Sequence, residues 1–77
     1  MSTFLIRAYR DPEANVWVAE SDDVPGLATE ADTWEALRDK LVEMVPDLLA
    51  LNSVQSAGEA KIHIVSEETV AVESAAA

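Results

Sequence analysis

The 77-residue chain contains no cysteine, so neither a disulfide framework nor a cysteine-ligated zinc ion can hold it together. Its two glycines, Gly26 and Gly58, lie too far apart for a glycine-rich phosphate-binding loop. No apolar run approaches the roughly 18 residues that span a membrane, and no basic-then-apolar leader opens the chain. We therefore expect a cytoplasmic protein without cofactor or membrane segment, whose one small core depends on packing.

Basic residues are also scarce: five Lys and Arg stand against fifteen Asp and Glu, which gives a formal net charge of −10. No Lys or Arg occurs between Asp11 and Glu35. Affinity for nucleic acid depends mainly on Lys and Arg contacts to phosphate, so direct binding to DNA or RNA is disfavoured. An acidic surface attracts a basic partner instead, although acidic residues also serve simply to keep a small domain soluble.

Three β-rich segments open the chain. Residues 3–9 and 16–21 flank a turn signal, Asp11-Pro12 with Asn15, and predict an antiparallel hairpin. Residues 22–26 interrupt the pattern, with Gly26 suited to a turn of positive φ, and residues 27–30 are long enough for a third short strand.

A helix follows. Asp32 or Thr33 can cap its first turn, and Glu35 stands three residues after Asp32, as in a capping box. Pro46 predicts a kink, or a restart of the helix in a new first turn. Apolar residues recur at helical spacing on one stripe, thickened by Val45 and Leu49: Trp34, Leu37, Leu41, Met44, Leu48 and Leu51.

Residues 61–65 alternate as a last strand, and residues 68–77 form an acidic, alanine-rich tail that we expect to be flexible. The fold class is thus α+β in the order β-β-β-α-β, a small, mainly antiparallel sheet with one helix on one face. Leu5 and Tyr9 share one face of the first strand, while Phe4 and Ile6 share the other, so both faces are apolar. An uncovered apolar face indicates an interface, and a homodimer is the simplest arrangement.

Catalytic chemistry finds little support. His63, the only histidine, lies between Ile62 and Ile64 without a nucleophile or orienting carboxylate nearby in sequence, and we interpret it as a structural or surface residue. Four acids, Asp22, Asp23, Glu30 and Asp32, could bind Mg²⁺ weakly, but their spacing fits no calcium loop. We expect no enzyme, no catalytic residue and no metal site.

Five short segments are more specific than their composition: residues 9–14 (YRDPEA), 16–19 (VWVA), 21–27 (SDDVPGL), 29–33 (TEADT) and 41–49 (LVEMVPDLL). Together they closely resemble a family of small stand-alone bacterial domains related to the HicB antitoxins, over about residues 4–67. HicB domains share a strand that ends in a Pro-Gly turn, a short strand and a T-x-x-E-A-L helix. Residues 33–37 (TWEAL) are similar to a version of it that is one residue shorter.

The resemblance implies a partial RNase H-like fold over residues 1–67, with the fourth strand beside the first, and without the carboxylate set of true RNase H. HicB antitoxins neutralise a small basic HicA toxin, which cleaves mRNA. Many carry a C-terminal DNA-binding segment, which we do not expect in the few acidic residues after Val65.

The sequence leaves three functions open. The first is a protein-binding, antitoxin-like module that covers a basic HicA-type toxin with its acidic surface. The second is an orphan homodimeric domain that binds another protein or a small ligand, and the third is a metal-dependent nuclease that uses the four acids above. For the first, the candidate partner-binding residues are Asp22, Asp23, Glu30, Asp32, Trp17 and Tyr9.

Overall fold

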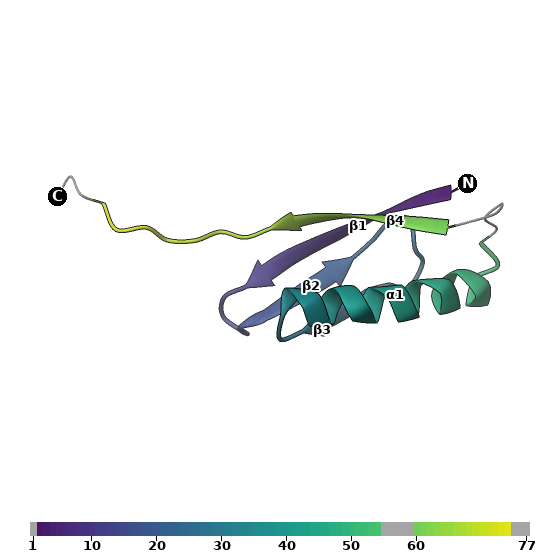
Figure 1. Cartoon of the computed structure of the whole chain (residues 1–77), viewed down its shortest axis with the longest axis horizontal. Helices are drawn as coiled ribbons and strands as arrows, with labels where there is room; N and C mark the ends of the chain where they lie inside the picture. The colour runs from purple at the N-terminus through teal and green to yellow at the C-terminus, as the bar shows by residue number, and fades with distance from the viewer. Residues whose placement is uncertain (1, 55–59, 75–77) are drawn as a thin grey trace.

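In the part of the chain that the structure describes, four strands and one helix follow one another in the order β-β-β-α-β, which confirms the predicted α+β class (Figure 1). A computed structural model describes residues 2–54 and 60–74. The elements are β1 (Ser2–Asp11), β2 (Val16–Glu20), β3 (Ala28–Ala31), α1 (Trp34–Leu51) and β4 (Ala60–Glu67).

The strands form one sheet in the order β3-β2-β1-β4. β2 runs antiparallel to both β1 and β3, whereas β4 runs parallel to β1. The sheet is therefore mainly antiparallel, and β4 lies beside β1. Because β3 and β4 form opposite edges, α1 carries the chain from one edge of the sheet to the other.

The turns use the residues that the sequence singled out. Asp11 accepts the backbone N–H groups of Glu13 and Ala14 on its side chain, and Asn15 takes a φ of 60°. At the second turn the N–H of Leu27 donates to the carbonyl of Val24 at 3.2 Å, and Gly26 has a φ of 79°. A positive φ at the third residue of a turn, directly after a proline, is the geometry of type II, so the expectation for Gly26 is confirmed.

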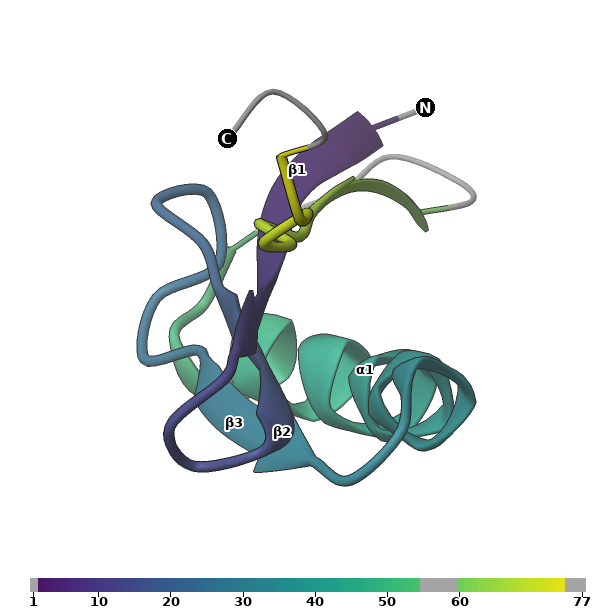
Figure 2. The ribbon, with the colours of Figure 1, turned by 90° about the vertical axis from the view of Figure 1, so that its left-hand side faces the viewer.

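One face of the sheet packs on the helix. This inner face carries the buried Phe4, Ile6 and Ala8 of β1, Ala19 of β2 and Ala31 of β3, with Ile62 and Ile64 of β4 partly buried against them. Figure 2 shows α1 on one side of the sheet only. The two apolar faces of β1 are thereby distinguished: Phe4 and Ile6 point to the helix, and Leu5 and Tyr9 to the opposite, outer face.

The N-cap of the helix is one residue later than the Asp32 position that a capping box with Glu35 requires. Thr33 is the N-cap, and its Oγ1 accepts the N–H of Ala36 at 3.0 Å. Asp32 lies outside the helix, so the predicted capping box between Asp32 and Glu35 does not form. Glu35 stands in the first turn, where its charge favours the positive end of the helix dipole.

The buried stripe of α1 differs slightly from the predicted one. Leu37, Leu41, Val45 and Leu49 are buried, so Val45 and Leu49 form its centre instead of its margin. Leu51 is 80% exposed because it stands in the last turn, about 200° around the helix axis from the buried Leu49. The helix also passes through Pro46 without interruption, so the alternative of a restart there is wrong.

A Schellman motif ends the helix. The N–H of Val54 donates to the carbonyl of Leu49 at 2.9 Å, and the N–H of Ser53 donates to that of Ala50 at 3.2 Å. Ser53 takes the left-handed φ of 55° that usually belongs to glycine. The motif places Val54 against the core. In the part of the chain that the structure describes, no helix is long and apolar enough to cross a membrane.

Candidate functional site

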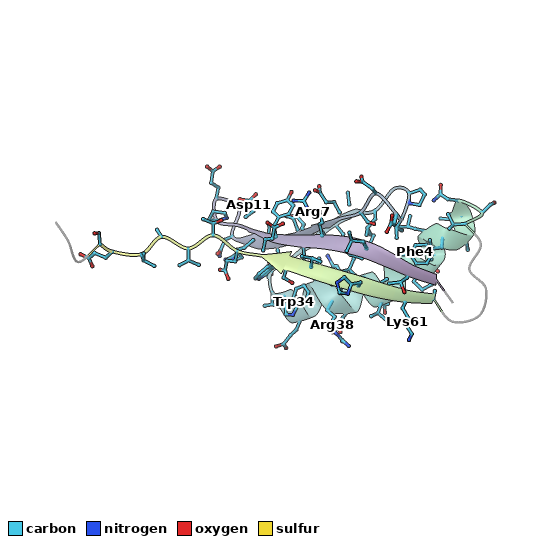
Figure 3. The ribbon with its side chains drawn as sticks, turned by 90° about the horizontal axis from the view of Figure 1, so that it is seen from above. Phe4, Arg7, Asp11, Trp34, Arg38 and Lys61 are labelled. Atoms are coloured by element: carbon cyan, nitrogen blue, oxygen red, sulfur yellow. The ribbon has the colours of Figure 1, made fainter. Side chains whose placement is uncertain are left out.

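The outer face of the sheet is the first candidate surface, because no helix of residues 2–54 and 60–74 covers it. We define it by the outward side chains of the four strands: Thr3, Leu5, Arg7, Tyr9, Asp11, Val16, Val18, Glu20, Ala28, Glu30, Lys61, His63, Val65 and Glu67. Figure 3 looks down on β1 and β4 with α1 behind them, and labels Arg7 and Asp11 along β1.

The strand register arranges these side chains in rows. Val18 is paired with both Tyr9 and Glu30, and Tyr9 is paired with Glu67. The row across the sheet is therefore Glu30, Val18, Tyr9, Glu67. Tyr9 and Val18 are half-buried and the two glutamates are exposed, so an apolar centre is bounded by a carboxylate at each end.

Arg7 occupies the middle of the next row. Its guanidinium lies 3.3 Å from a carboxylate oxygen of Glu20 and 3.4 Å from one of Glu67. These ion pairs are solvent-exposed and contribute little to stability. They do orient two acidic side chains and a basic one on the same surface, where Arg7 lies between Glu20 and the exposed Val65 in its own row and reaches Glu67 of the neighbouring row.

At the far end of the outer face, two side chains extend the hydrogen bonding of β1 beyond β2. The carboxylate of Asp23 accepts the backbone N–H of Leu5 at 2.7 Å, and the hydroxyl of Ser21 donates to the carbonyl of Leu5 at 2.5 Å. Ser21 also accepts the N–H groups of Asp23 and Val24, which fixes the loop. Asp22 stands exposed beside them.

The structure does not bring the six candidate residues together. Tyr9 and Glu30 lie in one row of the outer face, and Asp22 and Asp23 border its far end. Trp17 lies on the inner face, where its ring centre is 5.8 Å from that of Trp34 at an interplanar angle of 57°. Trp17 therefore anchors the start of the helix on the sheet.

Asp32 follows β3, next to the N-cap of α1, and lines a shallow depression together with Glu30. Glu30 and Asp32 thus stand at the β3 end of the molecule, away from Asp22 and Asp23. Among the described residues no three His, Asp or Glu side chains form a group that could hold a metal ion. His63 is exposed on the outer face, paired with Leu5 across the parallel ladder.

A second surface was not predicted from the sequence. A groove of about 530 Å³ lies between the C-terminal half of α1 and the start of β4. Its lining is apolar and includes Leu41, Val42, Val45, Pro46, Leu49, Val54 and Ile62. Val42 and Pro46 lie outside the apolar stripe that the sequence predicts. Two apolar residues four positions apart beside that stripe indicate that the helix has a second apolar side, and this pattern is the signal that the sequence offers for the groove.

Comparisons with known proteins place the chain among domains without an assigned role. A family model described as a domain of unknown function, DUF1902, matches residues 3–74. The crystal structure of the hypothetical protein TTHA1013 from the extremely thermophilic bacterium Thermus thermophilus is similar, with 47% sequence identity and a TM-score of 0.81. The match covers 91% of this chain and 99% of that one. A comparison with curated proteins found no match.

Proposed function

Since the chain belongs to the DUF1902 family, whose function is unknown, we propose from the geometry of its own outer face that it is a non-enzymatic module for binding a basic protein. The sequence resemblance to HicB antitoxins directs the proposal to one kind of partner. On this proposal the domain binds and neutralises a small basic toxin of the HicA type in the cytoplasm.

The row Glu30, Val18, Tyr9, Glu67 is the observation that carries the proposal. Protein interfaces combine a centre of apolar and aromatic side chains with a polar rim, and tyrosine is enriched among the residues that contribute most to binding. Here Tyr9 and Val18 form such a centre, and the two glutamates form a rim of negative charge. A basic partner can pair its Lys and Arg side chains with that rim while it covers the apolar centre.

The charge of the whole chain supports the same partner. A net charge of −10 on a domain of this size creates a negative potential that steers basic proteins towards it and repels nucleic acid. This repulsion counts against the nuclease alternative, as does the separation of Glu30 and Asp32 from Asp22 and Asp23. Binding of a basic protein by the outer face requires complementary shape and charge, and it requires no catalytic group.

Charge reversal on the outer face and at its border tests the proposal. Glu30→Lys combined with Asp22→Lys reverses two exposed carboxylates that make no side-chain hydrogen bond or ion pair recorded among the described residues. We expect the dissociation constant for a catalytically inactive HicA-type toxin, measured by titration calorimetry at low salt, to rise at least roughly tenfold.

The matched control is Glu43→Lys combined with Asp39→Lys, which makes the same charge change on the exposed side of α1. We expect it to weaken binding much less, because those positions face away from the outer face. An equal loss in both double variants would show that only net charge matters, and that the outer face is not the contact surface.

The existence of the partner is tested by a pull-down from the native lysate at low salt, with mass spectrometry of the eluate. Recovery of a small basic protein that is released as salt rises supports the proposal, and co-expression should then rescue cells from its toxicity. An eluate without any basic protein contradicts the proposal and favours an orphan homodimer with another role.

A further inference from the structure

β4 presents an open edge. It is the last strand in the order β3-β2-β1-β4, and over Ala60–Glu67 it is paired with β1 alone in the described sheet. The backbone N–H and C=O groups along its other side are therefore available to a further strand. An open edge of this length is a template for pairing with another extended chain.

The groove lies directly beside this edge. Ile62 of β4 lines it, opposite the helix residues Val42, Val45 and Leu49. Ile62 and Ile64 are only partly buried, although their side chains point to the inner face. A strand added to β4 would extend the sheet over the groove, and its own inward side chains would complete the core there.

The chain itself carries a segment of suitable chemistry. Residues 68–74 leave the end of β4 in an extended path that runs away from the body of the molecule (Figure 1). Val70 and Val72 are 65% and 86% exposed, and they alternate with Ala71 as the residues of a strand do. We call residues 68–74 the tail.

The tail of the same chain does not reach the groove. The groove lies at the start of β4, whereas the tail leaves from its end. If the chain reversed through a two-residue turn at residues 68 and 69, the tail would pair only as far back as His63 and would direct Val72 to the outer face. Glu68 and Thr69 also lack the glycine or asparagine that such turns require.

We propose that the tail of a second copy of this chain pairs antiparallel with β4 and that the exchange is reciprocal, giving a symmetric dimer with one continuous sheet. The register that matches apolar residues places Val70 opposite Ile64 and Val72 opposite Ile62. Opposed residues of antiparallel strands point to the same face, so both valines enter the inner side, with Val72 over the groove.

The same register is complementary on the outer face. It places Glu73 of the tail opposite Lys61 of the second copy, an acid opposite a base. The two-fold axis then passes between the Glu67 residues of the two copies. Each of these has an Arg7 guanidinium 3.4 Å from its carboxylate, which offsets the repulsion of two acids at the axis.

The oligomeric state tests the proposal. Light scattering of the full chain should give the mass of a dimer. Val70→Asp combined with Val72→Asp should weaken the dimer at least about 100-fold, because each dimer buries four of these side chains. Both residues are exposed in the single chain, so the variant should keep its circular dichroism spectrum and fold.

Ala71→Asp is the control, since it adds a negative charge to the same part of the tail but on the other face, one charge where the double variant adds two. We expect its dimer dissociation constant to stay within about threefold of the unmodified chain, as for most exposed substitutions. A monomeric unmodified chain at near-millimolar concentration would overturn the proposal. So would a dimer that the two valine substitutions leave as tight as the Ala71→Asp dimer, because the interface would then lie elsewhere.

The register has its own test, which the absence of natural cysteine makes simple. In Lys61→Cys combined with Glu73→Cys, mild oxidation should give a disulfide-linked dimer on a non-reducing gel. The two positions are twelve residues apart along one extended chain, about 40 Å, so they cannot join within one copy. Absence of the cross-linked band in a dimeric sample would rule out this register.

Discussion

The carboxylate of Asp23 accepts a backbone hydrogen bond from β1 in place of a neighbouring strand. β2 stops pairing with β1 at Arg7, and the N–H of Leu5 is left without a strand partner on that side. Asp23 accepts that N–H at 2.7 Å, while Ser21 donates to the carbonyl of the same residue. The loop after β2 thereby holds the first half of β1 in line with the second.

This role predicts a difference between two neighbouring acids. Asp23→Ala should lower the free energy of unfolding by about 1 kcal/mol, the usual net contribution of one hydrogen bond. Asp22→Ala should change it by no more than about 0.5 kcal/mol, because Asp22 is exposed beside the same loop. Urea unfolding followed by circular dichroism measures both, and equal losses would contradict the role given to Asp23.

Sequence reasoning placed both acids in one partner-binding set, since composition does not distinguish a carboxylate that binds backbone from one that faces solvent. The distinction depends on where β2 stops relative to β1, and that register is a property of the folded sheet. Trp17 falls in the same predicted set for a similar reason. Its face follows from its pairing with Ala31 and Arg10, which no local pattern specifies.

Among the elements, α1 combines the strongest sequence pattern with the one residue that opposes it. The N-cap at Thr33 and four buried side chains stabilise the helix over eighteen residues. Pro46 stands inside it and removes the hydrogen bond that residue 46 would donate to the carbonyl of Val42. Burial of Val45 and Leu49 on either side compensates for that loss, so the helix continues.

Replacement of the proline should therefore stabilise the fold. Pro46→Ala restores the N–H donor in the helix interior, and we expect the free energy of unfolding to rise by about 1–3 kcal/mol. Asp47→Ala is the control, with an expected gain of at most about 0.7 kcal/mol from helix propensity alone. Both are compared in urea at one protein concentration. If Pro46→Ala raises the free energy of unfolding no more than Asp47→Ala does, the helix has already relaxed around the proline.

The sequence predicted the elements themselves well, because their patterns are local. Ile62 and Ile64 alternate with Lys61 and His63, and the structure turns the isoleucines inward as the alternation requires. In β1 both faces carry apolar residues, and the polar Thr3 and Arg7, on the side of Leu5 and Tyr9, mark the outer one. The groove itself could not be predicted, because it forms between α1 and β4 and the residue spacing along the chain does not determine how these two elements are placed relative to each other.

For the whole molecule, the decisive quantity is the net charge of −10. Two copies of the chain repel one another, whereas a basic partner is attracted. Salt screens both effects, and the Debye length falls from about 30 Å at 0.01 M to about 8 Å at 0.15 M. The single exposed pair of Lys61 with Glu73 is too weak to reverse the sign for the dimer.

The two proposed interactions should consequently respond to salt in opposite directions. Between about 20 and about 500 mM NaCl we expect the dimer dissociation constant to fall several-fold and the dissociation constant of the toxin complex to rise several-fold. Sedimentation equilibrium measures the first and titration calorimetry the second. A dimer that weakens with salt would contradict an interface dominated by the apolar contacts of Val70 and Val72.

The position of α1 on a single face of the sheet has a consequence for valency. Edge-to-edge pairing of two such sheets about an axis normal to them leaves both helices on one side and both outer faces on the other. The dimer then presents two identical acidic surfaces in the same direction. A target with two basic patches at matching separation would engage both at once, and the second contact would form at a high effective concentration, so avidity would favour repetitive or paired targets over isolated ones.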